Sequence, residues 1–183
     1  YRACDGSVNI LDAGSGIRPL GNALMKEFAG KVKANIFVSH NHWDHIQGFP
    51  FFIPAYVPGN EIGIYSGDKK MRRSLDAAAR GNTLDPIEGH TEVLNRDLMN
   101  GSGNQTSSVL AIQQNPVNFP IALERMAATI KFHDLKEYEE VVDGEKISFM
   151  YHNAHPGGMF SYKIKDEGRI IVFNGDSEHD SEE

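Results

Sequence analysis

The chain has 183 residues, which is enough for one domain with a hydrophobic core of its own. Hydrophobic residues make up 40% of it and charged residues 23%, which is ordinary for a soluble globular protein. The formal net charge of -7 argues against general nucleic-acid binding, although a phosphate substrate stays compatible because bound divalent ions would reverse the local charge.

The cysteine content and the hydrophobic pattern bear on where the protein works. Cys4 is the only cysteine, so an intrachain disulfide is impossible and a cytoplasmic location is favoured. No apolar run approaches the roughly 20 residues that a membrane span needs, and no signal peptide is visible. We therefore expect a cytoplasmic protein without membrane contact. The sequence leaves its oligomeric state open, a homo-oligomer included.

Strands and helices alternate in the first part of the chain, and strands dominate afterwards. The expected strands are, in chain order, 8–11, 34–39, 61–66, 129–135, 146–152, 161–165 and 169–174. The expected helices are 17–29, 69–80 and a short one at 120–128. Residues 46–58 contain three prolines, which exclude one long helix and predict a short helix or turn followed by a rigid loop. This order favours a sheet-rich α/β sandwich formed as a single domain over residues 1–183.

Asn82 to Asn115 breaks this rhythm. The stretch contains few periodic apolar residues and includes the polar, glycine-containing run 101–108. A stretch of this length without regular structure is uncommon in a compact domain and typical of a lid, so we expect a mobile insertion at 82–115. His90 lies within it and is interpreted as an exposed loop residue.

The most informative stretch is His40-Asn41-His42-Trp43-Asp44-His45, which directly follows an apolar run that predicts a buried strand. A strand that ends there places these polar side chains in the loop at its end, where α/β enzymes build their sites. Imidazole nitrogens and a carboxylate oxygen suit zinc, manganese or iron, and four donors in six residues suit two ions better than one. The competing interpretation is a polar loop whose histidines are merely solvated.

The spacing divides these donors into two sets. His40 and His42 are alternate residues, so they point the same way in an extended backbone. Asp44 and His45 are adjacent, so they need a turn to converge on a second point. Trp43 is the only tryptophan of the chain, and we expect its ring to pack the loop down rather than to contact a substrate.

Two later donors stand where the same site would need them. His155 follows the expected strand 146–152, and Asp176 follows the expected strand 169–174. Each has glycines beside it that let the backbone turn sharply. Together with the histidine cluster they complete a candidate set of metal ligands.

With these residues in place, the sequence resembles the metallo-β-lactamase fold superfamily, over nearly the whole chain and in the family's order. The matching features are Leu11–Gly16, the HxHxDH pattern at 40–45, His155, and Asp176 after an apolar strand. Residues 39–56 and 153–158 look most like phosphodiesterase-type hydrolases, such as phosphoribosyl cyclic phosphate phosphodiesterases and, more distantly, the tRNA-maturing endonuclease RNase Z. The resemblance implies a four-layer αββα sandwich.

The resemblance also implies a ligand set. Carried over by position, His40, His42 and His155 would hold one ion, Asp44 and His45 a second, and Asp176 would bridge the two. Asp12 would lie behind these ligands and orient one of them.

The chain departs from the family near its end. Relatives supply a further histidine to the second ion near the C-terminus, and after Asp176 this sequence offers only His179. His179 is interpreted either as a group behind the ligands or as an exposed tail residue. We therefore expect a domain that is incomplete at both ends, with a second ion short of one ligand. His133 and His152 match no ligand position and are interpreted as structural.

The function that the resemblance implies is metal-dependent hydrolysis. We expect two divalent ions, zinc first and manganese or iron as alternatives, that share a hydroxide for in-line attack on a small cyclic or nucleotide-like phosphodiester. No serine or cysteine nucleophile is needed, and Asp44 is the candidate catalytic residue, through proton transfer. Three alternatives stay open. They are hydrolysis of a lactone, thioester or β-lactam, a metal-binding regulatory module without chemistry, and a di-iron redox role.

Overall fold

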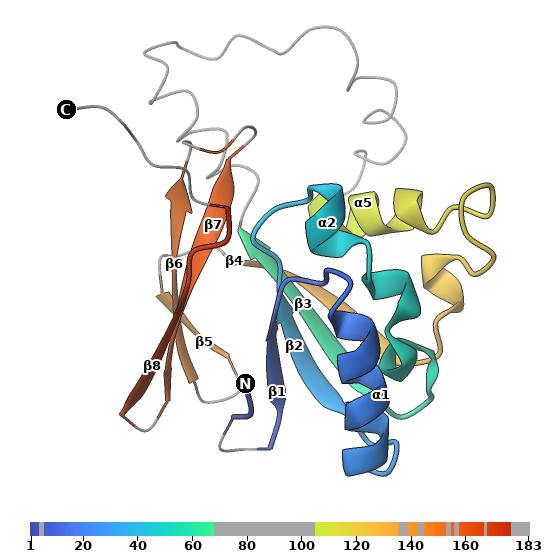
Figure 1. Ribbon diagram of the computed structural model, residues 1–183, viewed down its shortest axis with the longest axis horizontal. Coiled ribbons are helices and arrows are strands. Elements are labelled where there is room, and N and C mark those ends of the chain that lie inside the picture. The colour runs from blue at the N-terminus through green and yellow to red at the C-terminus, as the bar shows by residue number, and fades with distance from the viewer. Residues whose placement is uncertain are drawn as a thin grey trace, which may run out of the picture.

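The computed structural model describes residues 1–3, 6–67, 105–135, 139–142, 145–152, 155, 158–166 and 168–176. Within these residues two four-stranded sheets face each other, and helices pack on the far side of the first sheet (Figure 1). The strands are β1 Val8–Leu11, β2 Lys33–Phe37, β3 Glu61–Gly67, β4 Thr129–Leu135, β5 Glu139–Val142, β6 Glu145–His152, β7 Met159–Asp166 and β8 Arg169–Phe173. The helices are α1 Ile17–Glu27, α2 Trp43–Ile46 and α5 Gln105–Gln113, with 3-10 helices at Phe49–Phe51, Ile53–Tyr56 and Leu123–Arg125.

The first sheet is parallel, in the order β1-β2-β3-β4. β2 lies inside it and is buried from Ala34 onwards, which explains why its sequence is almost continuously apolar. Ala34 pairs with Val8 on one side and with Ile62 on the other. Parallel strands that are in register end at the same edge of their sheet. The residues after β1 and β2 therefore meet there, and they include Asp12 and the 40–45 motif.

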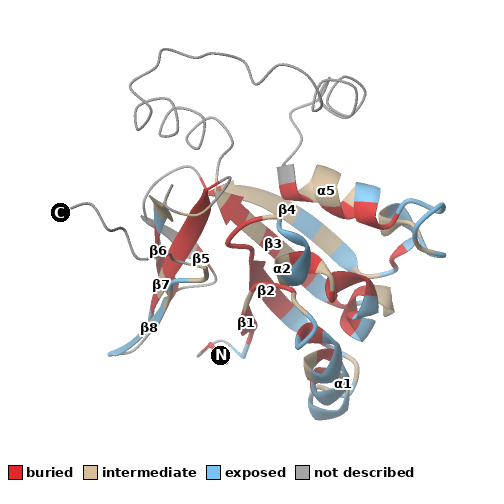
Figure 2. Ribbon diagram, turned by 45° about the horizontal axis from the view of Figure 1, so that its top comes forward, coloured by how far each residue is buried: buried red, intermediate tan, exposed pale blue. Residues whose placement is uncertain are grey.

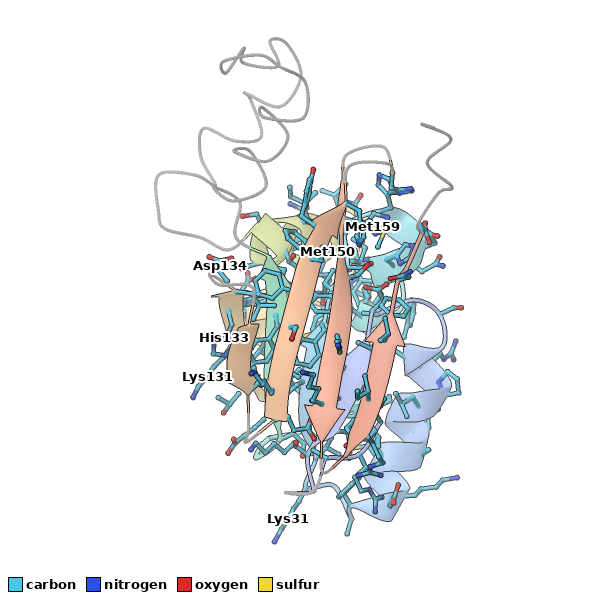
Figure 3. The ribbon with its side chains drawn as sticks, turned by 90° about the vertical axis from the view of Figure 1, so that its left-hand side faces the viewer. Lys31, Lys131, His133, Asp134, Met150 and Met159 are labelled. Atoms are coloured by element: carbon cyan, nitrogen blue, oxygen red, sulfur yellow. The ribbon has the colours of Figure 1, made fainter. Side chains whose placement is uncertain are left out.

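The second sheet is antiparallel, in the order β5-β6-β7-β8, and Figure 3 looks onto its outer face. Burial alternates along β6, so that Ile147 and Phe149 are buried between the sheets while Met150 is exposed. Ile170 and Val172 of β8 are exposed as well. In the described part of the chain no helix covers this outer face. The structure therefore shows a mixed α/β arrangement with three of the four layers that the resemblance implies.

Two hydrophobic clusters hold the layers together. The first lies between the parallel sheet and the helices and includes Leu24, Ile36 and Ile64, which are all 4% exposed or less. The second lies between the sheets and includes Phe37 and Tyr162, whose ring centroids are 5.6 Å apart. In Figure 2 the buried residues accordingly concentrate on the central strands of both sheets, while α1 turns an exposed side outwards.

The seven predicted strands are confirmed, with ends that shift by at most two residues. β5 has no counterpart in the prediction because its sequence, Glu-Glu-Val-Val, is short and half charged. The helix expected at 17–29 is confirmed as α1, two residues shorter. In 46–58 the expected short helix and proline-containing loop correspond to the end of α2 and two 3-10 helices.

Two other expectations about helices need correction. Residues 105–113 form α5 although they lie in the stretch expected to lack regular structure, and the apolar residues of α5 do not gather on one side to signal a helix. The short helix expected at 120–128 is reduced to one 3-10 turn, because the backbone is extended at both Ala122 and Met126. The helix expected at 69–80 and most of the insertion lie outside the described residues. None of the described helices is long and apolar enough to cross a membrane.

Candidate metal centre

His40 is placed by the end of β2 together with β7 of the other sheet. The Tyr162 hydroxyl donates to the Val38 carbonyl oxygen at 2.7 Å, and the Phe160 N–H donates to the Ser39 carbonyl oxygen at 2.9 Å. Burial raises the pKa of Tyr162 well above its ordinary value, so the hydroxyl keeps the proton for this bond. The two bonds fix the backbone just before His40, which is itself buried.

α5 holds the motif loop at both ends. The Thr106 hydroxyl donates to Asn41 Oδ1 at 3.0 Å, and Gln113 Nε2 donates to the Ile46 carbonyl oxygen at 3.1 Å. Ile46 is buried in the first hydrophobic cluster and so anchors the last residue of α2 in the core. The part of the expected insertion that the structure describes therefore supports the site.

Glycines let the loop after β1 come close to the motif. The Ala13 N–H donates to the His45 carbonyl oxygen at 2.7 Å, and the Gly48 N–H donates to the Ala13 carbonyl oxygen at 2.8 Å. A Cβ atom at Gly48 would lie 2.0 Å from the Gly14 carbonyl oxygen, and one at Gly14 would lie 2.7 Å from the Asp44 carbonyl oxygen. Only glycine permits this approach of the two backbones.

The structure brings five of the six candidate ligands into two overlapping groups. One ring nitrogen from each of His40, His42 and His155 lies within 4.8 Å of the others. His40, His45 and Asp176 form the second group within the same limit. These donors come from three separate chain segments, which follow β2, β6 and β8.

The hydrogen bonds around His40 determine its tautomer. The Ser39 hydroxyl donates its single hydrogen to Asp12 Oδ2 at 2.8 Å, so it accepts from His40 Nδ1, which lies 3.1 Å away. His40 Nε2 then carries a bare lone pair. This atom is buried and has no hydrogen-bond partner among the described residues. Burial, followed by the neighbouring imidazoles, lowers the pKa of His40 to about 4, so the ring is neutral near pH 7.

Asp12 acts on His45 in a similar way. Its Oδ1 accepts from the Ser39 N–H at 2.6 Å, and its Oδ2 lies 2.6 Å from His45 Nδ1. The proton on His45 Nδ1 therefore faces Asp12, and Nε2 faces Asp176 Oδ2 at 3.1 Å. Burial alone would lower the pKa of His45, but the hydrogen bonds to these two carboxylates outweigh it and raise the pKa. The contact predicted for Asp12 behind the ligands is present.

A pair of imidazoles from separate chain segments also meets in the site. His155 Nε2 is 2.9 Å from His42 Nδ1, and their ring centroids are 4.8 Å apart. A ring N–H on either nitrogen, or a cation between the two, makes this contact favourable. In a tetrahedral zinc site with bonds of 2.0–2.1 Å, two ligand nitrogens would be roughly 3.4 Å apart, so a small opening of this pair would admit an ion.

Two carboxylates, those of Asp176 and Asp44, lie near His45 Nε2. Asp176 follows Gly175, whose φ of +56° makes the sharp turn that brings the carboxylate to 4.0 Å from both His40 Nε2 and His155 Nε2. Burial would raise the pKa of Asp176, but the hydrogen bond and the charge of His45 lower it below its ordinary value. The Asp44 side chain is 69% exposed, with Oδ2 3.3 Å from His45 Nε2, and belongs to neither group of three.

These donors fit a divalent ion. A buried lone pair without a donor, as at His40 Nε2, costs about 1–3 kcal/mol, and metal coordination would remove that cost. Neutral imidazoles with one carboxylate are the donor set of zinc and related metals. The residues present can therefore hold a metal ion, and the identity and number of ions stay predictions.

A cavity of about 470 Å³ opens beside one edge of this site. Asp12, Asp44 and His45 line it on the side of the candidate ligands. Leu20 from α1 and Phe173 from β8 contribute to its apolar wall. A small molecule bound there could reach Asp44 directly.

The remaining predicted residues have mixed outcomes. Trp43 does not pack the loop down, since it is 62% exposed at the first position of α2, and that prediction is wrong. His133 stacks on Tyr65, with ring centroids 4.5 Å apart, and belongs to neither donor group, as a structural role requires. Cys4, His90 and His179 lie outside the described residues.

The sequence interpretation missed Ser39. It links Asp12 to His40 through its hydroxyl and N–H. A hydroxyl directly before the first histidine of the motif was the available signal, but its partner lies 27 residues away in the chain.

Comparison with models of known protein families finds no match for this chain, and comparison with curated proteins finds none. The resemblance to the metallo-β-lactamase fold superfamily therefore rests on the motifs and their order.

Proposed function

We propose that this protein is a metal-dependent hydrolase, with a small cyclic or nucleotide-like phosphodiester as its substrate class. The observation that carries the metal part is His40 Nε2, which is buried and has no hydrogen-bond partner among the described residues. His40 is also the residue that the two groups of candidate ligands share. A site that served only to stabilise the fold would pair donors with acceptors.

The substrate class is proposed on the motif resemblance around 39–56 and 153–158. Divalent ions in this site would offset the negative charge of a phosphodiester and make water a usable nucleophile near neutral pH. Asp176 belongs to one donor group and lies 4.0 Å from His155 Nε2 of the other, and a carboxylate within reach of both groups favours a centre for two ions. Zinc is the first candidate, because three imidazoles form one of the groups.

The chain's own residues have separate tasks in this proposal. Asp12 and Ser39 hold the protons of His45 and His40 on the nitrogens that face away from the ions. The Asp44 side chain is exposed and lines the cavity, so its carboxylate can accept a proton from water.

The test compares metal content and hydrolysis in the unmodified protein, His42→Ala and His133→Ala. His42 belongs to a donor group, whereas His133 on β4 does not, so the second variant controls for the loss of an imidazole. We expect bound metal and hydrolysis of a chromogenic phosphodiester in the unmodified protein and in His133→Ala. In His42→Ala the loss should exceed the roughly 10–100-fold that is typical of groups behind a ligand.

Three outcomes would contradict the proposal in different ways. No bound metal after reconstitution would remove the metal centre altogether. Faster turnover of a β-lactam, lactone or thioester than of the phosphodiester would keep the hydrolase and change the substrate class. Bound metal without turnover of any ester would indicate a regulatory metal-binding module.

A further inference from the structure

Ser161 joins the two strand ends that carry His155 and Asp176. Its hydroxyl lies 2.7 Å from His152 Nε2 at the end of β6 and donates to Asn174 Oδ1 at 3.1 Å just after β8. Ser161 lies on β7 of the antiparallel sheet and is only 6% exposed. We call the two hydrogen-bond contacts of its hydroxyl the Ser161 bridge. His152 precedes His155 by three residues, and Asn174 precedes Asp176 by two.

The bridge lies where the backbone ladders of this sheet stop. The last pair between β6 and β7 is His152 with Met159, and the first pair between β7 and β8 is Tyr162 with Phe173. Among the described residues, no ladder pair follows His152 on β6 or Phe173 on β8. Figure 3 shows the three strands side by side, with Met150 and Met159 labelled near this end.

The direction of the hydrogen bonds makes the bridge a single unit. A serine hydroxyl has one hydrogen, which here goes to Asn174. It therefore accepts from His152, which must carry its proton on Nε2. Removing the hydroxyl leaves the His152 donor and the Asn174 acceptor without this partner at once.

We propose that Ser161 is a positioning residue for the metal centre, acting through His152 and Asn174 on the loops that carry His155 and Asp176. The inference rests on the metal-binding part of the proposed function. His155 Nε2 and Asp176 Oδ2 are 4.0 Å apart, and both must stay near the same point to share one set of ions. The Ser161 bridge holds the starting points of both loops at a fixed separation.

The experiment measures cobalt binding to the full chain, because cobalt(II) occupies zinc-type sites and its visible absorption depends on ligand geometry. Ser161→Ala removes the bridge, and Asn174→Ala breaks it from an exposed position that cannot disturb the core. Ser161→Thr keeps a hydroxyl and suits a strand. Ser148→Ala, on β6 of the same sheet, is the matched control.

We expect Ser161→Ala and Asn174→Ala to bind cobalt roughly 10–100-fold more weakly, with an altered visible spectrum, as for other groups that support a ligand. Ser161→Thr should restore both properties, and Ser148→Ala should match the unmodified protein. Normal cobalt affinity and spectrum in a folded Ser161→Ala protein would overturn the positioning role alone. Absence of cobalt binding in the unmodified protein would overturn the metal centre on which the role depends.

Discussion

Asp12→Asn is the sharpest test of how the site sets its proton positions. The φ angle of Asp12 is +60°, a left-handed conformation that asparagine adopts as readily as aspartate. The substitution therefore changes hydrogen bonding without straining the backbone. The amide keeps one oxygen, which the Ser39 N–H needs, and places an NH₂ group where Oδ2 now accepts from Ser39 and His45.

The NH₂ group forces both partners to reverse. His45 must present a lone pair at Nδ1, so its proton moves to Nε2, where a metal ion would bind. Ser39 must accept from the amide and give its hydrogen to His40 Nδ1, so His40 also carries its proton on the ligand nitrogen. One substitution thus turns two ligand nitrogens into donors. We expect at least the roughly 10–100-fold loss of metal affinity seen for such supporting groups, equal to about 1.4–2.7 kcal/mol.

The assay is competition for zinc between the protein and a chromophoric chelator, with circular dichroism to verify the fold. Ser39→Ala serves as the comparison, because it breaks the link to His40 and leaves the bond between Asp12 and His45 in place. Ser39→Ala should lose less zinc affinity than Asp12→Asn. A folded Asp12→Asn protein with unchanged zinc affinity would refute the assignment of proton positions.

Three further outcomes are expected. Gly48→Ala should abolish metal binding, because its Cβ would lie 2.0 Å from the Gly14 carbonyl oxygen. Gly16→Ala, which has open space around its Cβ, should bind metal normally, and similar chelator competition curves for the two variants would contradict this. Zinc titration should show one tighter and one weaker site, because His40 belongs to both donor groups and cannot serve two ions. Asp44→Asn should lower the zinc affinity of the weaker site only, and two sites of equal affinity in calorimetry would be evidence against unequal sites. Cobalt should quench the fluorescence of Trp43, which is the only tryptophan and directly follows His42. Tryptophan emission that does not change when cobalt is added would contradict the placement of the site.

The sequence predicts every described strand except β5, because each of the others has a strong local pattern. β2 is apolar almost throughout, and β6 alternates, so their ends could be placed within two residues. The ends of strands, in turn, locate the candidate ligands. Convergence of the 40–45 motif with His155 and Asp176 was therefore predictable once strand ends and donor residues were considered together.

Other features depend on contacts that no local pattern records. Trp43 is exposed at the first position of the short helix α2 while Ile46 at its last position is buried, and a four-residue helix has no periodic pattern that would separate the two. α5 is a helix without an apolar stripe, and its hydrogen bonds to Asn41 and Ile46 become visible only in three dimensions. Ser161 is one serine within a predicted strand, and its partners lie on two other segments. Tertiary placement decides all three.

The candidate ligands come from both sheets, so metal binding and the packing of the sheets must favour each other. His40, His42 and His45 follow β2 of the parallel sheet, whereas His155 and Asp176 belong to the antiparallel sheet. The contact of His42 with His155 and the bonds from Tyr162 and Phe160 to the end of β2 already join the sheets at this edge. An ion held by His40, His42 and His155 would add a further link between the same two sheets. Binding energy at the centre is in that sense also folding energy of the sandwich.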